Sequence, residues 1–514
     1  MTSSGVSQLS RLGGSGRSFR ATAAVAVALG FVVLLAGWWC FANGYILYYG
    51  DAESHLNISR AIVDSRTPGY DQLGTVWLPA LHVMCVLFAK NDWLWTTGLA
   101  GSIPVALCFV IAGTCFYLAA HETYGSTPAA LVAVACFALN PNVLYLAVIP
   151  MTEIVFMAAL SVALLAALRF GKTQEGKWFW LALAASWALS LTRYDGWFLI
   201  PFLGWWLSIS AKSHKLLHLL AFGFAASLAP AYWVAHNWWE TGNAFDFING
   251  TYSPVAIQQS KPYPGYRDWI AAAHYYATAG QLCAGGGLIL LGVAGTRFAV
   301  RYRLWTPLLF LLLTPLFYIW SMHSSGGTPI YVPSLWPHSY YNSRYGIAVL
   351  PLCAFAAGSL VLAIPQRWRK LSAALPVIAI APWLSHPSPQ SWICWKESQV
   401  NSLDRRAWTA AAVRILGPSY TAGQGILTST GDVTGIYRSA GIHLTETLNI
   451  GNGPQWFLAT TRPDLFHPNV WLVMQRGDAL SRMLAHKHAP YSDLLSITTT
   501  KFSPPLSVAR RDLP

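Results

Sequence analysis

Charged residues are scarce in this sequence. Only 10% of the 514 residues are charged, with 20 acidic side chains in all, whereas 54% are hydrophobic. About a quarter of the residues in a typical soluble domain are charged. The composition therefore excludes an ordinary soluble protein and indicates a polytopic membrane protein.

Paired cysteines are also lacking. None of the eight cysteines forms a C-x-x-C pair, most lie inside apolar runs, and only Cys394 lies in the expected external tail. The spacing therefore predicts neither a disulfide framework nor a structural zinc site.

Long apolar runs are abundant and supply the elements of the predicted fold. Eleven runs are compatible with the roughly 17–25 residues that a helix needs to cross a bilayer, allowing for short or broken helices. We therefore predict a mainly α fold with about eleven transmembrane helices. The runs cover residues 21–41, 97–119, 128–148, 151–170, 178–192, 196–211, 216–235, 281–296, 304–321, 345–364 and 371–384.

The net charge of +13 reflects topology. Basic residues gather on alternate connections, which the positive-inside rule places in the cytoplasm. The N-terminus is then inside, the C-terminus is outside, and nucleic-acid binding has no support. These residues are Arg11, Arg17, Arg20, Arg169, Lys172, Lys177, Lys212, Lys215, Arg297, Arg301, Arg303, Arg367, Arg369 and Lys370.

Three domains are predicted along the chain. Residues 1–20 form a cytoplasmic tail before an apolar run too long for a signal-peptide core, so we expect a retained anchor. Residues 21–384 form the transmembrane domain. Residues 385–514 are predicted to form a small external α/β domain after the linker "SHPSPQSW". Its segment "SQVNSLDRRAWTAAAVRILG" is typical of a helix that ends at Gly417 and Pro418, and "GILTST" and "VWLVMQRG" are strand-like. Asp432 and Asp478 follow these strands, and we favour turns over ligand sites for both.

Almost all carboxylates of the membrane region fall on the predicted external side. They include those of the loop that begins "YYGDAESHLNIS" and those of "PMTE", "TRYDGW" and "HNWWETGNAFDF", and an arginine lies in "HSYYNSRYG". Isolated charges near lipid are expensive, so their convergence suggests an active-site cavity that opens outward. In the first external loop, "AESHLNISRAIVDS" and "TVWLPALHVMCVLFA" predict two amphipathic helices on the membrane surface, the first ending at Pro68 and Gly69 and the second interrupted at Pro79.

These motifs carry a family resemblance. The chain resembles the GT-C fold of membrane glycosyltransferases, because it has an Asp directly after the first span, two amphipathic helices in the first loop and about eleven spans. It is similar to protein O-mannosyltransferases and aminoarabinose transferases, which have this fold. "GDAESHLNISRAIVDSRTPGYDQLGTVWLP" resembles the first-loop signature of a bacterial and archaeal branch, and "TRYDGW" and "YNSRYG" resemble its later motifs. The family more often has Glu where this chain has Asp195.

The resemblance implies a polyprenyl-phosphate sugar as donor, a glycan, lipid or protein as acceptor, and a multi-pass enzyme in the inner (plasma) membrane. It implies hexosyl or pentosyl transfer with inversion. Asp51 matches the family's catalytic aspartate and is expected to be the general base, with Glu153 positioning the acceptor or sharing the proton. Arg344 and Arg193 suit the donor phosphate.

Further expected substrate-binding residues are Asp195, His55, Glu53, Tyr345 and Gln72. No cofactor is assigned, and a divalent metal at Asp51 and Glu53 is left open.

Each assignment has a structural alternative. Asp51 could cap the helix that starts at Ala52, and Glu153 could be a helix-start acid favoured by the dipole. Arg193 and Asp195 could form a local ion pair, Arg344 could hold an ordinary headgroup, and His55 could be structural. A transporter, which also has many spans and intramembrane charges, is the alternative function.

Overall fold

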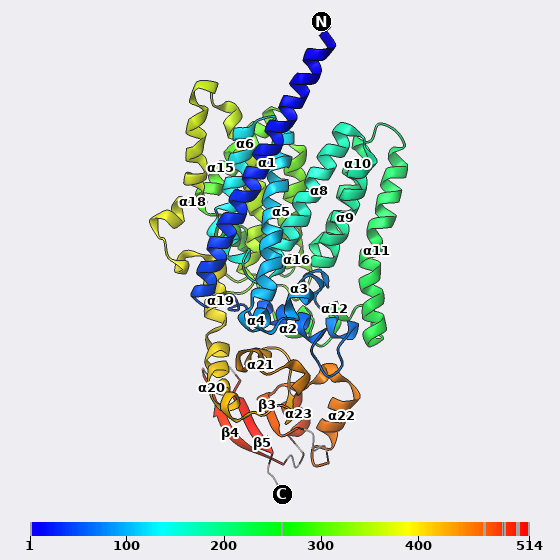
Figure 1. The fold of residues 1–514 in the computed structure, drawn as a ribbon, viewed down its shortest axis with the longest axis vertical. Coiled ribbons are helices and arrows are strands. Elements are labelled where there is room, and N and C mark those ends of the chain that lie inside the picture. Colours follow the sequence, from blue (N-terminus) through cyan, green and yellow to red (C-terminus); the bar gives the residue numbers. More distant parts are fainter. Residues whose placement is uncertain are drawn as a thin grey trace. The chain divides into compact units, whose positions relative to one another are not determined.

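A computed structural model describes residues 3–258, 261–465, 469–485, 487, 490–499 and 504–511, with side chains from Phe19 onward. The chain divides into two compact units (Figure 1). The helical unit comprises Met1–Asn43, Val105–Val148 and Thr152–Glu397. The mixed unit comprises Gly44–Pro104, Ile149–Met151 and Ser398–Pro514. The first loop thus groups with the C-terminal residues, whereas the predicted domain boundaries assign it to the transmembrane domain.

The helical unit is built from a series of helices and short 3-10 turns. Consecutive helices α8 to α11 pack against one another, and α15 packs against α17 and α18. The elements are α1 (Ser3–Ala42), α5 (Leu99–Tyr124, which starts in the mixed unit), α6 (Thr127–Ala138), α7 (Pro141–Leu146), α8 (Thr152–Thr173), α9 (Gly176–Thr192), α10 (Asp195–Ser210), α11 (Lys215–Thr241), α12 (Asp246–Asn249), α13 (Pro254–Gln258), α14 (Trp269–Ala284), α15 (Gly286–Arg301), α16 (Thr306–Ser324), η2 (Ser343–Val349), α17 (Leu350–Ser359), η3 (Leu360–Ala363), η4 (Gln366–Ala373), α18 (Ala374–Ser385), η5 (Pro389–Ser391) and α19 (Ile393–Asn401).

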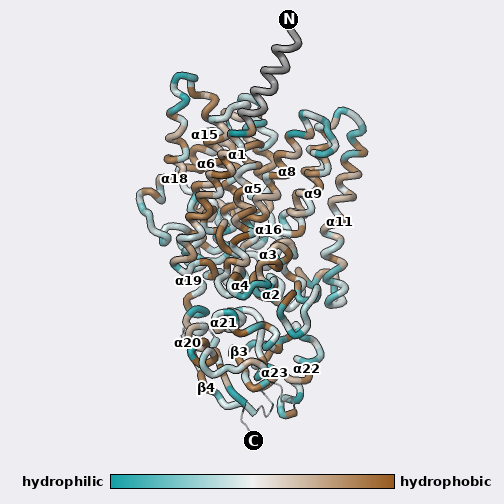
Figure 2. Tube along the Cα trace, viewed as in Figure 1, coloured by the Kyte–Doolittle hydropathy of each residue, from teal (hydrophilic) through white to brown (hydrophobic). Residues whose placement is uncertain are grey.

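Several of these helices are long and apolar enough to cross a membrane. Within the described residues six meet this test, and the bent pair α14 and α15 would make a seventh. Figure 2 shows hydrophobic residues along these helices and hydrophilic residues near their ends. The protein is therefore a mainly helical, multi-pass membrane protein. The predicted number of eleven spans stays a prediction, because α9, α10 and α18 are shorter than the test requires and the run 128–148 is broken into α6 and α7.

Local sequence explains where these breaks fall. Helix α7 is capped by Asn140, whose side chain accepts hydrogen bonds from the backbone N–H groups of Asn142 (2.9 Å) and Val143 (3.3 Å), and Pro141 occupies the first turn. Helices α14 and α15 meet at 107° around Gly285, which has φ +82°. A Cβ atom there would lie 2.8 Å from the Trp383 ring, so both the backbone and the packing require glycine.

The mixed unit contains one sheet and short helices. Strands β1 (Ile426–Thr428), β2 (Thr447–Leu448) and β3 (Trp471–Gln475) are parallel, whereas β5 (Leu506–Arg511) is antiparallel to β3 and to β4 (Tyr491–Ile497). The strand order is β2-β1-β3-β5-β4. The two strands predicted from sequence are β1 and β3, and they are neighbours. The helical elements are α2 (Gly50–Ala61), η1 (Tyr70–Leu73), α3 (Ala80–Ala89), α4 (Asp92–Thr97), α20 (Leu403–Ser419), α21 (Thr434–Ala440), η6 (Leu444–Glu446), η7 (Ile450–Asn452), α22 (Pro454–Thr461) and α23 (Ala479–Leu484).

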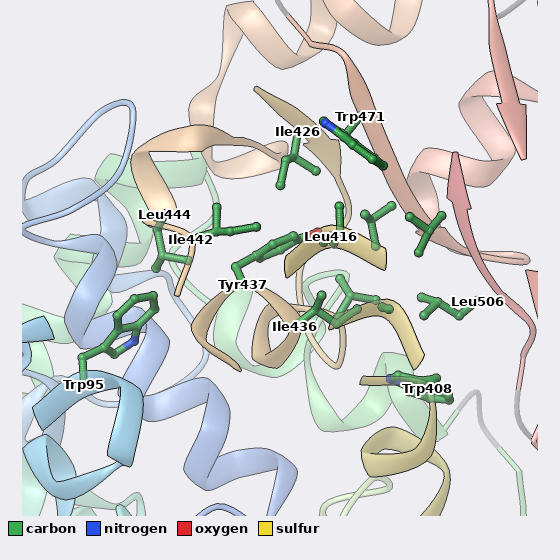
Figure 3. Packing of buried hydrophobic residues seen from close by; sticks show 14 of the residues in the cluster. Trp95, Trp408, Leu416, Ile426, Ile436, Tyr437, Ile442, Leu444, Trp471 and Leu506 are labelled. Carbon is green, nitrogen blue, oxygen red and sulfur yellow. The ribbon is translucent and has the colours of Figure 1, made fainter. Parts of the chain in front are cut away.

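First-loop and C-terminal residues share one hydrophobic core in the mixed unit. Trp95 of the first loop belongs to the same buried cluster as Trp408, Tyr437 and Trp471 (Figure 3). Aromatic side chains of this size dominate the burial energy of a small core. The first loop is therefore an integral part of the unit that contains the sheet.

Three details of the sequence prediction were wrong. Helix α2 ends at Ala61, before the predicted end at Pro68 and Gly69, whereas α3 begins at Ala80, directly after Pro79, in agreement with the predicted break at this proline. Helix α20 continues past Gly417 to Ser419. The polar face of α2 is also buried, with Glu53 only 4% exposed, because its charges find partners inside the mixed unit.

We predict that Gly295→Ala destabilises the helical unit, because a Cβ atom there would lie 2.0 Å from the backbone oxygen of Ala356 in the facing helix α17. The expected loss is about 1–3 kcal/mol of unfolding free energy, measured by thermal unfolding in detergent. The matched control is Gly223→Ala in α11, where a Cβ atom meets nothing within 4 Å. Equal stability of the two variants would contradict the packing of α15 against α17.

Candidate functional site

A buried network of charges lies in the helical unit. Glu153, in the first turn of α8 and 3% exposed, accepts hydrogen bonds through Oε1 from Arg193 Nη1 at 3.2 Å and from Arg344 Nε at 3.1 Å. Three residues that are far apart in the sequence thus meet at one carboxylate oxygen. The predicted association of "PMTE" with the two arginine motifs is visible in this geometry.

Arg193 occupies the extended junction between α9 and α10 and makes several contacts. Its Nη1 donates to Thr152 Oγ1 at 2.7 Å, and its Nη2 donates to the Tyr318 hydroxyl at 2.8 Å. Its Nε lies 3.4 Å from Asp195 Oδ1, and the Tyr318 hydroxyl also donates to Asp195 Oδ2 at 3.0 Å. The local ion pair considered for Arg193 and Asp195 therefore forms, as part of a larger network.

Arg344 is held by a second carboxylate. Its Nη1 donates to Glu397 Oε1 at 2.8 Å, and its backbone N–H donates to Glu397 Oε2 at 3.1 Å. Ser343 Oγ donates to the same Oε2. Sequence reasoning missed Glu397, although the signal was present, since it is the only carboxylate in residues 385–403.

Tyr345 lies between the two arginines. The guanidinium groups of Arg193 and Arg344 lie 5.0 and 5.1 Å from its ring centroid, and the Tyr318 ring lies 5.0 Å away. An aromatic face attracts cations at these distances. The structure thus brings Tyr345 into the network with four of the predicted residues.

The network carries more negative than positive charge and borders a small cavity. Its carboxylates are Glu153, Asp195 and Glu397, against the guanidinium groups of Arg193 and Arg344. The cavity offers about 20 Å³ for the centre of a water-sized sphere. Within the described residues, Glu153 Oε2 has no hydrogen-bond partner, and one water molecule fits a space of this size.

Asp51 lies in the mixed unit, in the first turn of α2. The cap of this helix is Tyr49, so the structure does not place Asp51 at the capping position considered from sequence. Asp432 lies beside the helix start, because a Cβ atom on Gly50 would be 3.6 Å from Asp432 Oδ1. Desolvation raises the pKa of Asp432, the Arg405 guanidinium lowers it, and the carboxylates of Asp51 and Glu53 raise it further. A second carboxylate therefore accompanies the expected base.

Glu53 is fully engaged in holding the mixed unit together. Arg438 of α21 binds it with two bonds, Nε to Oε1 at 2.6 Å and Nη2 to Oε2 at 3.1 Å. Asn57 Nδ2 donates to Oε1 at 3.3 Å. A carboxylate bound by a guanidinium on both oxygens is a poor metal ligand, and no group of three or more His, Cys, Asp or Glu in the described part of the chain could hold a metal ion.

His55 and Gln72 also contact neighbours in the mixed unit. His55 Nδ1 lies 2.8 Å from His82 Nε2, and its ring packs 4.8 Å from Trp77. Gln72 Nε2 donates to the oxygens of Thr67 (3.0 Å) and Gly451 (3.3 Å). Both side chains therefore have structural contacts, in agreement with the structural alternative for His55.

Comparisons with known proteins agree with this architecture. Residues 80–239 match the family model of the dolichyl-phosphate-mannose-protein mannosyltransferases. The structure is similar to the crystal structure of ArnT from Cupriavidus metallidurans bound to undecaprenyl phosphate, with a TM-score of 0.54 and 15% identity over 95% of this chain and 97% of ArnT. The chain has the GT-C fold. No curated protein matches the sequence.

The resemblance drawn from the sequence motifs is thereby confirmed at the level of the fold. The GT-C family match includes Glu153, Arg193 and Asp195, whereas Asp51 and Arg344 lie outside it. The roles of all five residues remain predictions.

We predict that the Glu53–Arg438 pair stabilises this GT-C protein's mixed unit, because removing one member of a buried ion pair leaves a charge unpaired. Glu53→Gln or Arg438→Met should each lower the unfolding free energy by about 3 kcal/mol, and the double variant should lose less than the sum. Thermal unfolding measures all three.

The control is the exposed pair Arg462–Asp464, where Asp464→Asn should change stability little. A Glu53→Gln variant that keeps full stability but loses activity would show instead that Glu53 acts on substrate.

Proposed function

We propose that this protein is an integral-membrane glycosyltransferase that moves a hexosyl or pentosyl group from a polyprenyl-phosphate donor to a glycan, lipid or protein acceptor. The observation that carries this proposal is the GT-C fold, which extends over 95% of the chain, together with the mannosyltransferase family match. The similar ArnT structure holds undecaprenyl phosphate, which supports a polyprenyl-phosphate donor here.

The distribution of charge supports a particular orientation. Basic residues on alternate connections place residues 1–20 in the cytoplasm and residues 385–514 outside. The reaction would then take place on the external face of the inner (plasma) membrane. Donor and acceptor would both be reached from that side.

The proposed reaction is a single displacement. The acceptor hydroxyl gives its proton to Asp51 while its oxygen forms a bond to the anomeric carbon. The bond from that carbon to the phosphate oxygen breaks, and its electron pair leaves with polyprenyl phosphate. The new bond forms opposite the leaving group, so the anomeric configuration inverts.

The helical unit would supply a guanidinium ligand for the donor phosphate. Arg344 is our principal candidate for the donor phosphate, because guanidinium groups bind phosphate oxygens with two bonds and stay charged near lipid. Arg193 contacts Thr152, Glu153, Asp195 and Tyr318, so we assign it to fixing the network. Glu153 remains the candidate for positioning the acceptor.

We predict that Asp51→Asn abolishes sugar transfer, with a loss in kcat of at least about 10²-fold, since the amide cannot accept the acceptor proton. The measurement is transfer of labelled sugar from a panel of polyprenyl-phosphate sugars by purified protein in liposomes, with native membrane extract as acceptor.

The matched control is Asp71→Asn, which changes an exposed carboxylate of the same loop and should keep the activity. Full transfer by a folded Asp51→Asn variant would remove Asp51 as the base and move the search to Glu153.

A transporter is the second candidate, favoured by one observation. The 107° break between α14 and α15 is a bent helix pair of the kind that transporters place at their substrate sites. Substrate uptake by proteoliposomes without sugar transfer would support this reading over the enzyme.

A further inference from the structure

Glu397 is a buried carboxylate whose hydrogen-bond donors come from a single segment. It is 1% exposed on α19, and its donors are Ser343 Oγ, the Arg344 backbone N–H and Arg344 Nη1. One of its oxygens binds the backbone of η2, and the other binds the Arg344 guanidinium. Glu397 therefore binds both the backbone N–H and the guanidinium group of Arg344.

The geometry also fixes the orientation of the guanidinium plane. Glu397 Oε1 holds Nη1 at 2.8 Å, and Glu153 Oε1 holds Nε at 3.1 Å. Two carboxylates that hold different nitrogens of one planar group leave it little freedom to rotate. Burying a carboxylate costs several kcal/mol unless its partners are well placed, so this arrangement is more demanding than apolar packing would be.

Helix α19, which carries Glu397, crosses the boundary between the two units of the chain. The helix runs from Ile393 to Asn401, and the division between the two units falls within it, after Glu397. The helix that carries Glu397 is thus continuous with the C-terminal part of the chain.

We propose that Glu397 is a positioning residue for Arg344, which it orients toward the donor phosphate. The inference rests on the proposed function, because the phosphate is the ligand that Arg344 would bind. Glu397 itself touches no substrate in this account.

The test is a double-mutant cycle of Glu397→Gln and Arg344→Gln in the full-length protein. A Gln side chain keeps the shape of Glu397 but has one acceptor oxygen, so it satisfies either the η2 backbone or the guanidinium. We expect Glu397→Gln to lower kcat by about 10²-fold with little change in donor KM, because the positive charge stays but is misplaced. The double variant should be no worse than Arg344→Gln alone.

Two further variants separate positioning from folding. Ser343→Ala removes one bond to Glu397 and leaves both bonds to Arg344, so it should keep most of the activity. Glu397→Asp keeps the charge and both oxygens, so it should recover part of the loss in kcat, and it replaces Glu397→Gln in the cycle if that variant does not fold.

The possible results are distinct. Losses in kcat that multiply in the double variant, or a Glu397→Gln variant with unchanged kcat, would overturn the proposal. If the wild-type protein transfers no sugar from any donor, the proposed function fails.

An experimental structure of Glu397→Gln then still tests whether Glu397 positions Arg344. Displacement of the Arg344 guanidinium from Glu153 would support the positioning role of Glu397, and an unchanged guanidinium position would refute that role.

Discussion

The helical unit depends on one interaction, the pairing of buried carboxylates with Arg193 and Arg344. Each guanidinium is held by two carboxylates, with Glu153 common to both. In a low-dielectric interior an unpaired charge costs several kcal/mol, so α8, the α9–α10 junction, η2 and α19 have to meet in one arrangement. Apolar helix packing alone would tolerate many registers. The ion pairs favour a single register of these helices. In that register Arg344, the candidate phosphate ligand, is held between Glu153 and Glu397.

The same principle organises the mixed unit with different residues. Arg438 binds Glu53, and Arg405 Nη2 donates to the backbone oxygen of Leu47 at 3.3 Å. Arg60 Nη2 donates to Asp92 Oδ1 at 2.6 Å. The contacts of Arg438 and Arg405 join the first loop to the C-terminal helices near the start of α2, where Asp51 lies, and the Arg60–Asp92 pair ties the end of α2 to another part of the same loop. The position of the proposed base is therefore a property of a unit assembled from both ends of the sequence.

Much of this could be predicted from sequence because the signals are local. An acid after a span, an arginine in "NSRYG" and an apolar run before a polar turn can each be read within a few residues, and four motif residues, Glu153, Arg193, Asp195 and Arg344, do converge. Long-range partners could not be predicted. The residues next to Glu397 in the sequence do not indicate that its partner is Arg344. Those next to Arg438 do not indicate that its partner is Glu53. The burial of the polar face of α2 follows from those partners, whereas the sequence pattern alone predicts an amphipathic helix on the membrane surface.

The most direct test of the account follows the two halves of the donor. A polyprenyl-phosphate sugar labelled separately on the sugar and on the phosphate is supplied to purified protein in liposomes with acceptor. The account predicts that the labels separate, with the sugar label on the acceptor in inverted configuration and the phosphate label left on the lipid, one for one. Labels that cross the membrane together and remain joined would contradict it and identify a transporter.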